Sequence, residues 1–560
     1  MPLYKIWQLP TPPKHDLVEQ LSQAFQLFPL VSSILIRRGY TTVEEVEAFL
    51  SPQLSRLHDP YLMRDMKEAV CLLKRTILSN KRIVILGDYD VDGITATTMM
   101  TLFLNECGCN NTDYFIPNRF EHGYGLTQAS VDVLLGMKPD LVLTVDNGIT
   151  AVREVQRLHE HGIKTLITDH HLPYQDNIPA GVILNPNHPD CNYPDKKISG
   201  CGVALKLLMA MRKEFRDSQY WSSQRPEPNL KSYLDLAALG TVADVVPLVN
   251  ENRLLVYHGI KVMNTQPRFG IQALAQLKNV RTITSQTLAF QFAPLLNAAG
   301  RMHEASAGVK LLLSTDLHKA AEIAKSLDQV NNERRTREAQ MLQLALEQAK
   351  GLQHKSSLVV TSSEFHEGIS GIVAARLMEH FYKPAFVFAV NGEFYKGSAR
   401  SIPELHIKNA LDQCQGYLEK YGGHAAAAGC TIHQSRFEAF TKKFEALCLE
   451  ELTPSPQPLL QLDGKLEIEM IGWDLIEQLE LLQPFGAINS PPIFSIPAPQ
   501  QSYQIIKSTH AKWNFRRLEI MGWNLAKPFY ENPPKSLAVH LGINEFRGER
   551  KIQLVVQAFQ

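Results

Sequence analysis

Carboxylate and imidazole side chains gather at three points in the first third of the chain, each directly after a short apolar run. The clusters are Asp88-Tyr89-Asp90, Asp146-Asn147-Gly148 and Asp169-His170-His171. Carboxylate oxygens and imidazole nitrogens bind divalent cations such as Mn²⁺ and Mg²⁺. Two such cations about 3.5–4 Å apart can activate a water molecule and stabilise both oxygens of a phosphoryl displacement. The clusters therefore predict a centre with one or two metal ions and phosphoryl-transfer chemistry.

Three apolar runs must position these clusters. Residues 82–86, 140–145 and 164–168 are short and rich in β-branched side chains, a pattern typical of parallel strands buried on both faces. Helical patterns separate the runs, so the predicted fold class is α/β. The carboxyl ends of parallel strands meet at one edge of a sheet, and ligands bind there. A turn would explain any one cluster, but three in succession at the same edge favour a metal site.

The spacing of the acids suggests how they share the metal. Asp88 and Asp90 are two residues apart across the bend that follows the first run, so both can reach one centre. Asp146 comes from the end of another strand and could bridge two ions. His170 adds a neutral imidazole, and a site with oxygen and imidazole ligands suits Mn²⁺ better than Ca²⁺.

A fifth candidate ligand lies further along the chain. Asp244 interrupts an otherwise apolar stretch, residues 236–247. A buried carboxylate must be paired, hydrogen-bonded or bound to a metal, because an isolated buried charge is too costly. The alternative is an ordinary helix cap, and we favour metal ligation.

Composition and charge limit the function classes. Lys+Arg and Asp+Glu number 57 each, so binding to a polyanion would need locally clustered charge. The eight cysteines lack zinc-site spacing, which indicates reduced thiols. The start of the sequence lacks the architecture of a signal peptide, and no apolar stretch is long enough to span a bilayer. We expect a cytoplasmic protein that does not contact a membrane, with a monomer as the default state.

Changes of pattern along the 560 residues predict several domains. Alternating strands and helices give way to a long polar segment without Gly or Pro, then to a second α/β pattern, a Pro-rich linker and short alternating strands typical of a small β-barrel. The expected segments are an N-terminal helical lead-in (1–75), a parallel-sheet domain (76–315), a connecting helix (316–352), a second α/β domain (353–452) and a C-terminal barrel (453–560).

Ordered motifs in the sequence resemble a known family. Four of them resemble the motifs of the DHH phosphoesterase superfamily: Asp88–Gly93, Val145–Gly148, Asp169–His171 and Gly240–Asp244. Six further segments resemble the RecJ family within it: Ile116–Leu126, Asn297–Met302, His366–Arg376, Gly397–Ser401, Gly422–Gly429 and Asn544–Gly548. Together they run from about residue 80 to the C-terminus.

The resemblance implies a fold, an activity and partners. The expected fold is a DHH domain, a DHH-associated domain and an OB-like barrel. The implied activity is that of a 5′-to-3′ exonuclease on single-stranded DNA in repair and recombination, with Mn²⁺ or Mg²⁺. A single-strand-binding protein and a DNA helicase are the expected partners. The related family II pyrophosphatases carry a histidine where this chain has Val84, so the second metal site is expected to have fewer ligands. Whether the site holds one ion or two is therefore an open question.

The resemblance also implies roles for the clustered residues. His171 would face the scissile phosphate, with Asp169 orienting it. The ligands of the tighter ion would be Asp90, Asp146, His170 and Asp244, and those of the second ion would be Asp88 and Asp146.

Five residues are expected to hold the DNA. The resemblance places the loop of Arg119 beside the metals, although Arg119 could be a plain surface arginine. Arg301 follows two small residues, which permit a close approach of the backbone. Ser398 and Arg400 are expected on a turn led by a glycine, where they would grip the 5′-terminal phosphate with Arg301. His424 follows two glycines, which fits either a phosphate-cradling loop or a glycine turn at the start of a helix.

Basic and aromatic residues alternate in the last hundred residues, in His510–Arg517 and Phe546–Lys551. Charge runs are usually solvated faces, but this alternation in a barrel favours an OB-fold that binds single strands. Two other functions compete. A phosphodiesterase for very short oligonucleotides or cyclic dinucleotides would lack this tail, and a non-catalytic scaffold would have degenerate metal motifs.

Overall fold

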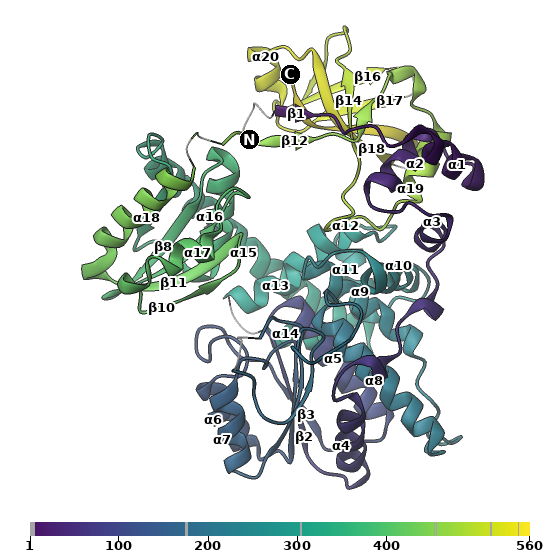
Figure 1. Cartoon of the computed structure of the whole chain (residues 1–560), viewed down its shortest axis with the longest axis vertical. Coiled ribbons are helices and arrows are strands. Elements are labelled where there is room, and N and C mark those ends of the chain that lie inside the picture. Colours follow the sequence, from purple (N-terminus) through teal and green to yellow (C-terminus); the bar gives the residue numbers. More distant parts are fainter. Residues whose placement is uncertain are drawn as a thin grey trace. The chain divides into compact units, whose positions relative to one another are not determined.

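The computed structural model describes residues 6–173, 177–302, 305–452, 454, 456–515, 518–546 and 548–560. The chain forms two compact units. We call them the parallel-sheet unit, which holds Glu47–Asn332 and Leu482–Ser490, and the mixed-sheet unit, which holds the residues up to Val46, Glu333–Leu481 and Pro491–Gln560. Figure 1 shows the elements of both. Each unit is described by itself.

The parallel-sheet unit is built on five strands in the order β3-β2-β4-β5-β6, all parallel. The three strands predicted from the apolar runs are confirmed as β2, β4 and β5. Their last residues, Gly87, Val145 and Thr168, lie side by side in register, so the residues that follow them leave the sheet at one level. The strands are β2 (Ile83–Gly87), β3 (Thr112–Phe115), β4 (Leu141–Val145), β5 (Lys164–Thr168) and β6 (Val182–Leu184).

Helices cover both faces of this sheet (Figure 1). Ile83 and Ile85 of β2 pack into one buried cluster, while Val84 and Leu86 pack into another on the opposite face. Apolar side chains at every position of a strand are therefore explained by burial on both faces. The helices are α4 (Met66–Leu78), α5 (Val91–Glu106) and α8 (Gly200–Asp217) on the first face, with α6 (Gln128–Met137) and α7 (Val152–Glu160) on the second.

Further helices complete this unit. Most carry apolar side chains into the same core as α5 and α8. They are η1 (Leu54–Arg56), η2 (Pro60–Leu62), η3 (Leu230–Tyr233), α9 (Leu234–Ala243), α10 (Asn250–Thr265), α11 (Phe269–Leu277), α12 (Ser285–Thr287), η4 (Leu288–Phe292), α13 (Ala293–Met302) and α14 (Ser306–Leu312). The polar segment that follows is one helix, α15 (Leu317–Lys350).

A buried ion pair fixes α8 against α10. The Lys206 ammonium lies 2.5 Å from a Glu251 carboxylate oxygen and donates a second hydrogen bond to the His58 carbonyl. Glu251 also accepts from the Tyr193 hydroxyl. Lys206 and Glu251 are each 1% exposed. Removing one partner of such a pair leaves an unpaired buried charge, which is more costly than losing the pair as a whole.

We expect Glu251→Gln to destabilise this unit by about 3–5 kcal/mol, because Lys206 would stay buried without its counter-charge. Urea or thermal unfolding measures the effect. Asp217→Asn is the matched control: Asp217 pairs with Lys213 on the surface of the same helix α8, where both side chains are more than half exposed, and surface pairs add little. Equal unfolding midpoints for the two variants would contradict the expectation.

The mixed-sheet unit contains a five-stranded sheet in the order β10-β11-β9-β8-β7. Only β7 and β8 run parallel. Its core holds Phe386 and Phe388 of β8 against Phe440 and Phe444 of α18. The elements are β7 (Leu358–Ser362), α16 (Glu367–Phe381), β8 (Ala385–Asn391), β9 (Phe394–Arg400), α17 (Ile407–Asp412), η5 (Gln415–Tyr417), β10 (Lys420–Gly423), β11 (Ala427–His433), η6 (Gln434–Arg436) and α18 (Phe437–Glu451).

One expectation about this sheet is wrong, and one of the two alternatives for His424 is excluded. Ser398 and Arg400 are not on a turn: they lie in β9, paired with β8 on one side and β11 on the other. His424 does not precede a helix, because it lies in the hairpin between β10 and β11, where its backbone N–H donates to the Ala427 carbonyl. In both places the glycines belong to strands that pair with their neighbours in the sheet.

A seven-stranded mixed sheet lies at the C-terminal end of the chain, in the order β13-β14-β18-β19-β17-β16-β15. Its strands are β13 (Gly464–Lys465), β14 (Ile493–Pro497), β15 (Gln504–Ile506), β16 (His510–Phe515), β17 (Leu518–Gly522), β18 (Ser536–Phe546) and β19 (Glu549–Phe559). The same part of the chain also holds β12 (Leu459–Gln461), η7 (Ile468–Met470), α19 (Trp473–Glu480) and α20 (Ala526–Glu531). Of the basic-aromatic segments, Arg516, Arg517 and Arg547 lie outside the described residues.

The N-terminal segment divides between the two units. β1 (Ile6–Gln8) pairs in parallel with β12, and Arg37 donates to the Asp463 carbonyl, so this part joins the C-terminal residues. Residues from Glu47 onward belong to the parallel-sheet unit. The helices of the N-terminal segment are α1 (His15–Phe25), α2 (Pro29–Arg37) and α3 (Val43–Leu50). Among the described residues, no helix combines the length and the apolar character that crossing a membrane requires.

Candidate metal centre

Three aspartates of the candidate site lie at the carboxyl ends of β2, β4 and β5. Asp88, Asp146 and Asp169 are each the first residue beyond a strand, and these strands end in register. β2 lies between β3 and β4. The chain therefore passes from β2 to β3 on one side and then crosses to β4 on the other side. Such a switch in strand order opens a crevice at the carboxyl edge. The topology therefore places Asp88 and Asp146 at the part of the sheet best suited to bind a ligand.

Asp90 is held by the start of α5. One of its carboxylate oxygens accepts hydrogen bonds from the backbone N–H groups of Asp92 and Gly93, at 3.0 and 3.1 Å. This is the geometry of a helix N-cap. Because only one oxygen makes these bonds, the other is available for a cation. Burial first, and then the charge of Asp92, raise the pKa of Asp90 above its usual range.

Asp146 sits in a strained backbone conformation with φ of 62°. Its carboxylate oxygen Oδ1 is buried, and no hydrogen-bond partner for it occurs among the described residues. A Cβ at Gly200 would lie 2.4 Å from that oxygen, so only glycine lets the start of α8 approach so closely. Burial and the charges of four neighbouring aspartates raise the pKa of Asp146 well above its usual range. A carboxylate buried in this way needs a positive charge close by in order to ionise.

Asp169 holds His171 in place. Its carboxylate accepts from the backbone N–H groups of His170, His171 and Ile149 and from the Nδ1 of His171, the last at 2.7 Å. Burial opposes ionisation of Asp169, but the bond to His171 and the histidine charges outweigh it and lower its pKa. Burial likewise lowers the pKa of His171, yet the bond and the charge of Asp169 outweigh it and raise that pKa to about 9. Each partner of this pair therefore favours the charged form of the other.

His170 points its Nε2 at three acids. That atom lies 3.2 Å from Asp146, 3.6 Å from Asp244 and 4.0 Å from Asp92, each measured to a carboxylate oxygen. Burial lowers the pKa of His170, although the charge of Asp92 opposes this. A neutral imidazole is the form that binds a metal.

Asp244 directly follows the C-terminal end of α9. Asp244 is the C-cap residue of that helix, so the helix-cap alternative fits its backbone and leaves the role of its carboxylate open. The C-terminal end of a helix carries partial negative charge, so a carboxylate there is unfavourable unless a cation is near. Burial and the charges of Asp92 and Asp90 raise the pKa of Asp244 to about 9. Its position favours a metal ligand.

Asp92 joins the cluster, although the sequence reasoning did not select it. Its two carboxylate oxygens accept from the backbone N–H groups of Gly200 and Cys201, at 2.7 and 2.9 Å, at the start of α8. It thereby ties α5 to α8 beside the metal candidates. A signal existed, because Asp92 is the third acid in the same motif as Asp88 and Asp90.

Two asparagines were also missed. Asn185 donates to the His171 carbonyl, and Asn187 donates to the His170 carbonyl. They follow β6, so the loop after one strand fixes the backbone of the loop after its neighbour. The motif Asn185-Pro186-Asn187 is a turn signal, but its contact with the histidines depends on strand pairing.

The residues present fit a divalent cation. Asp88 Oδ1, Asp146 Oδ1 and His170 Nε2 are buried without a hydrogen-bond partner in the described part of the chain. Burial and the charge of Asp90 also raise the pKa of Asp88 well above its usual range. A cation would satisfy these atoms and remove the repulsion. Three sets of ligand atoms lie within 4.8 Å of one another: Asp88, Asp90 and Asp146; Asp146, His170 and His171; and Asp92, His170 and Asp244.

We expect Asp169→Asn to lower activity about 10–100-fold, the usual cost of losing the group that orients a site residue. It should also lower the pKa of His171, because the charge and hydrogen bond that raise it would be weakened. The pH dependence of kcat measures both effects. The control is Asp217→Asn, which makes the same chemical change on the exposed surface of α8. An unchanged pH profile for Asp169→Asn would contradict the expectation.

Arginine and aromatic side chains line the approach to the acids. The Arg119 guanidinium lies 5.6 Å from the centre of the Tyr89 ring, and the charges of Arg119 and Arg301 both act on the Tyr89 hydroxyl. Tyr124, which the sequence reasoning did not select, places its hydroxyl 3.1 Å from His171 Nε2. The structure thus brings Arg119, Arg301 and Tyr124 next to the loop that carries Asp88 and Asp90.

Ser398, Arg400 and His424 belong to the mixed-sheet unit. Ser398 and Arg400 are two residues apart in β9, so their side chains share one face of the sheet. The Arg400 guanidinium packs beside Gly371 of α16 and donates to the Ala399 carbonyl. These three residues and the metal candidates lie in different units, and their role stays a prediction.

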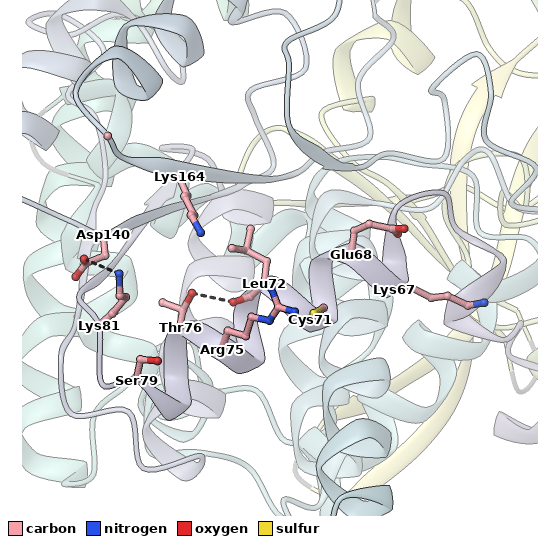
Figure 2. A pocket seen from close by; sticks show the side chains of 11 residues that line it. Lys67, Glu68, Cys71, Leu72, Arg75, Thr76, Ser79, Lys81, Asp140 and Lys164 are labelled. Carbon is pink, nitrogen blue, oxygen red and sulfur yellow. Dashed lines mark hydrogen bonds and ion pairs between the residues drawn. The ribbon is translucent and has the colours of Figure 1, made fainter.

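A separate pocket of about 490 Å³ lies at the other edge of the parallel sheet, where β2, β4 and β5 begin. Figure 2 shows Lys81 paired with Asp140, while Lys164 and Arg75 point into the same region. Its residues come from α4 and from the starts of the strands, so it is distinct from the acidic cluster.

Comparison with known proteins gives consistent matches along the chain. Residues 82–241 match the DHH family, N-terminal domain; residues 354–450 match the DHHA1 domain; and residues 462–558 match the RecJ OB domain. The chain is 36% identical to the single-stranded-DNA-specific exonuclease RecJ of Dickeya dadantii, over 94% of this chain and 95% of that protein. It is 35% identical to the Escherichia coli protein of the same name, over 95% and 96% respectively.

A solved structure extends the match to three dimensions. The crystal structure of RecJ from Thermus thermophilus in complex with Mn²⁺ aligns with a TM-score of 0.84 and 29% identity, over 99% of this chain and 79% of that one. The complex of the same protein with Mg²⁺ aligns with a TM-score of 0.78.

Proposed function

The chain belongs to the RecJ family of single-stranded-DNA-specific exonucleases, and we propose that it is a metal-dependent exonuclease that removes nucleotides from single-stranded DNA. The observation that carries this proposal is the buried cluster of acids and His170 at the carboxyl edge of the parallel sheet. The proposed direction is 5′ to 3′, in DNA repair and recombination. Mn²⁺ or Mg²⁺ is the metal.

The proposed ligands are those that the family resemblance implies, and the grouping of the atoms supports part of this assignment. Asp146 belongs to two of the three sets, which supports its role as the bridge. We assign Asp90, Asp146, His170 and Asp244 to one ion. Asp88 and Asp146 would hold the other, with Asp90 near enough to contribute.

The chain's own residues prepare the phosphate for attack. When bound, the metal ions activate a water molecule and stabilise the charge on the phosphate oxygens. His171, held by Asp169 through Nδ1, would donate from Nε2 toward negative charge that develops on the phosphate, in place of its contact with the Tyr124 hydroxyl. Tyr124 limits the rotation of His171 through the contact at Nε2. Arg119 and Arg301 place positive charge beside the same loop.

The remaining DNA contacts are proposed for the mixed-sheet unit. Ser398 and Arg400 would grip the 5′-terminal phosphate together with Arg301, and His424 would belong to a phosphate-cradling loop. The match of residues 462–558 to the RecJ OB domain supports binding of the single strand there. A single-strand-binding protein and a DNA helicase are the proposed partners. We further propose that the enzyme acts in the cytoplasm as a monomer.

We expect strand binding to weaken steeply with salt although Lys+Arg and Asp+Glu balance at 57 each. Each phosphate neutralised by a basic side chain contributes about −0.7 to the slope of log K against log salt for single strands. Fluorescence anisotropy with a labelled oligonucleotide in EDTA measures the slope. Arg301→Ala should make the slope shallower by the contribution of about one phosphate contact. Lys213→Ala, on the exposed face of α8, should leave the slope unchanged. A slope near zero would contradict the proposal.

Digestion of a long single strand labelled at either end tests the function. The expected result is loss of nucleotides from the 5′ end in the presence of Mn²⁺ and no loss of nucleotides in EDTA. Tight binding without cleavage would point to a non-catalytic scaffold. Cleavage of di- and trinucleotides alone would assign the protein to phosphodiesterases of small substrates.

A further inference from the structure

A nine-residue strap, Leu482–Ser490, belongs to the parallel-sheet unit, although the residues on both sides of it in the chain belong to the other unit. We use "strap" for these residues only. The connection means that a segment from the C-terminal third of the chain is part of the unit that carries the acids.

Buried polar contacts hold the strap. The Arg253 guanidinium donates to the carbonyls of Leu482 and Gln483 and also to that of Phe49, at 2.7–3.3 Å. Arg253 is 4% exposed. Asn489 closes the strap on itself by donating to the Leu482 and Pro484 carbonyls. Buried donors satisfied in this way favour one conformation of the strap.

The strap packs on the segment that follows Asp244. The Leu248 backbone N–H donates to the Ala487 carbonyl at 3.0 Å. A Cβ at Gly486 would lie 2.6 Å from the Leu248 side chain, which is 1% exposed. The strap therefore contacts the chain only four residues beyond a candidate metal ligand.

Both contacting segments contain backbone strain. Val245, directly after Asp244, has φ of 58°, and Ile488 of the strap has φ of 65°. Positive φ is a genuine outlier for β-branched residues. Such strain costs about 1–3 kcal/mol and persists only where the surroundings over-determine the conformation. The hydrogen bond and the packing between the segments supply that constraint.

We propose that the strap positions Asp244 for metal binding, so that the metal centre depends on a segment of the C-terminal third of the chain. This inference rests on the proposed function. Leu248 and the strap hold one end of the loop, and α9 holds the other, which leaves Asp244 one orientation toward His170. Asp88 and Asp146 extend directly from strands of the sheet, so loosening the strap weakens metal binding without abolishing it.

Gly486→Ala in the full chain tests the inference, because its φ is not positive and the added methyl group pushes the strap away from Leu248. Asn489→Ala is the second variant, since it removes atoms where Gly486→Ala adds them. Gly136→Ala in α6 is the control: a Cβ there meets nothing within 4 Å. Mn²⁺ affinity is measured by electron paramagnetic resonance, and kcat and KM are measured on single-stranded DNA.

We expect both strap variants to raise the Mn²⁺ dissociation constant about tenfold, the lower end of the effect of lost supporting contacts at metal sites. At low Mn²⁺, kcat should fall while KM for DNA stays the same, and high Mn²⁺ should restore kcat. Wild-type Mn²⁺ affinity in both variants would overturn the inference, as would a loss of kcat that high Mn²⁺ does not restore. If the wild-type chain itself neither binds Mn²⁺ nor cleaves, the proposed function fails instead.

Discussion

Asp146→Asn is expected to lower cleavage of single-stranded DNA about a thousandfold or more. Asp146 belongs to two of the three ligand sets, so its loss affects every proposed ion. A metal contributes several kcal/mol to stabilising the transition state, and each 1.36 kcal/mol corresponds to a factor of ten. Asparagine is the appropriate replacement, because it tolerates the positive φ of Asp146 better than alanine does.

The same substitution is expected to stabilise the metal-free protein by about 1 kcal/mol or more, the free energy of one pKa unit. Asp146 is buried among other acids, and the asparagine removes that repulsion. Activity, Mn²⁺ binding and thermal unfolding in EDTA measure the three effects. Asp217→Asn on the surface should change none of them. A destabilised metal-free Asp146→Asn protein would show that the acid has a structural partner instead of a metal.

The metal-free protein is expected to lose stability relative to Asp146→Asn as the pH rises above about 4. An unfolded aspartate has a pKa of about 3.9, whereas the pKa of Asp146 in the folded protein lies well above this. The folded state therefore keeps protons that the unfolded state releases, so its advantage is greatest at low pH and disappears as the folded pKa is passed. Unfolding of both proteins in EDTA at pH 5, 6.5 and 8 measures the difference.

Mn²⁺ binding should reverse this dependence, because the ion displaces the protons that the acids hold. For each proton released, the Mn²⁺ dissociation constant should fall about tenfold per pH unit. Calorimetry in two buffers with different ionisation enthalpies counts the protons. A dissociation constant that is the same at pH 6 and pH 8 would contradict raised pKa values for the acids.

Local pattern was enough to predict the core of the site. A short buried strand appears in the sequence as a continuous apolar run, and the first acidic residue after the run shows where the strand ends. Because parallel strands must end at a common edge, the sequence alone places Asp88, Asp146 and Asp169 together. The fold class followed from the same pattern, and the order of the domains followed from the family resemblance.

Long-range contacts decided the rest. Asp92 meets the start of α8 more than a hundred residues later in the chain, and Ser398 lies in a strand because β8 and β11 pair with β9 on both sides. The strap reaches the loop after Asp244 from more than two hundred residues away. Sequence periodicity reports which side chains a segment buries, but not which distant segment buries them. Partners of this kind are selected by the packing of the whole unit, and only the tertiary structure reveals them.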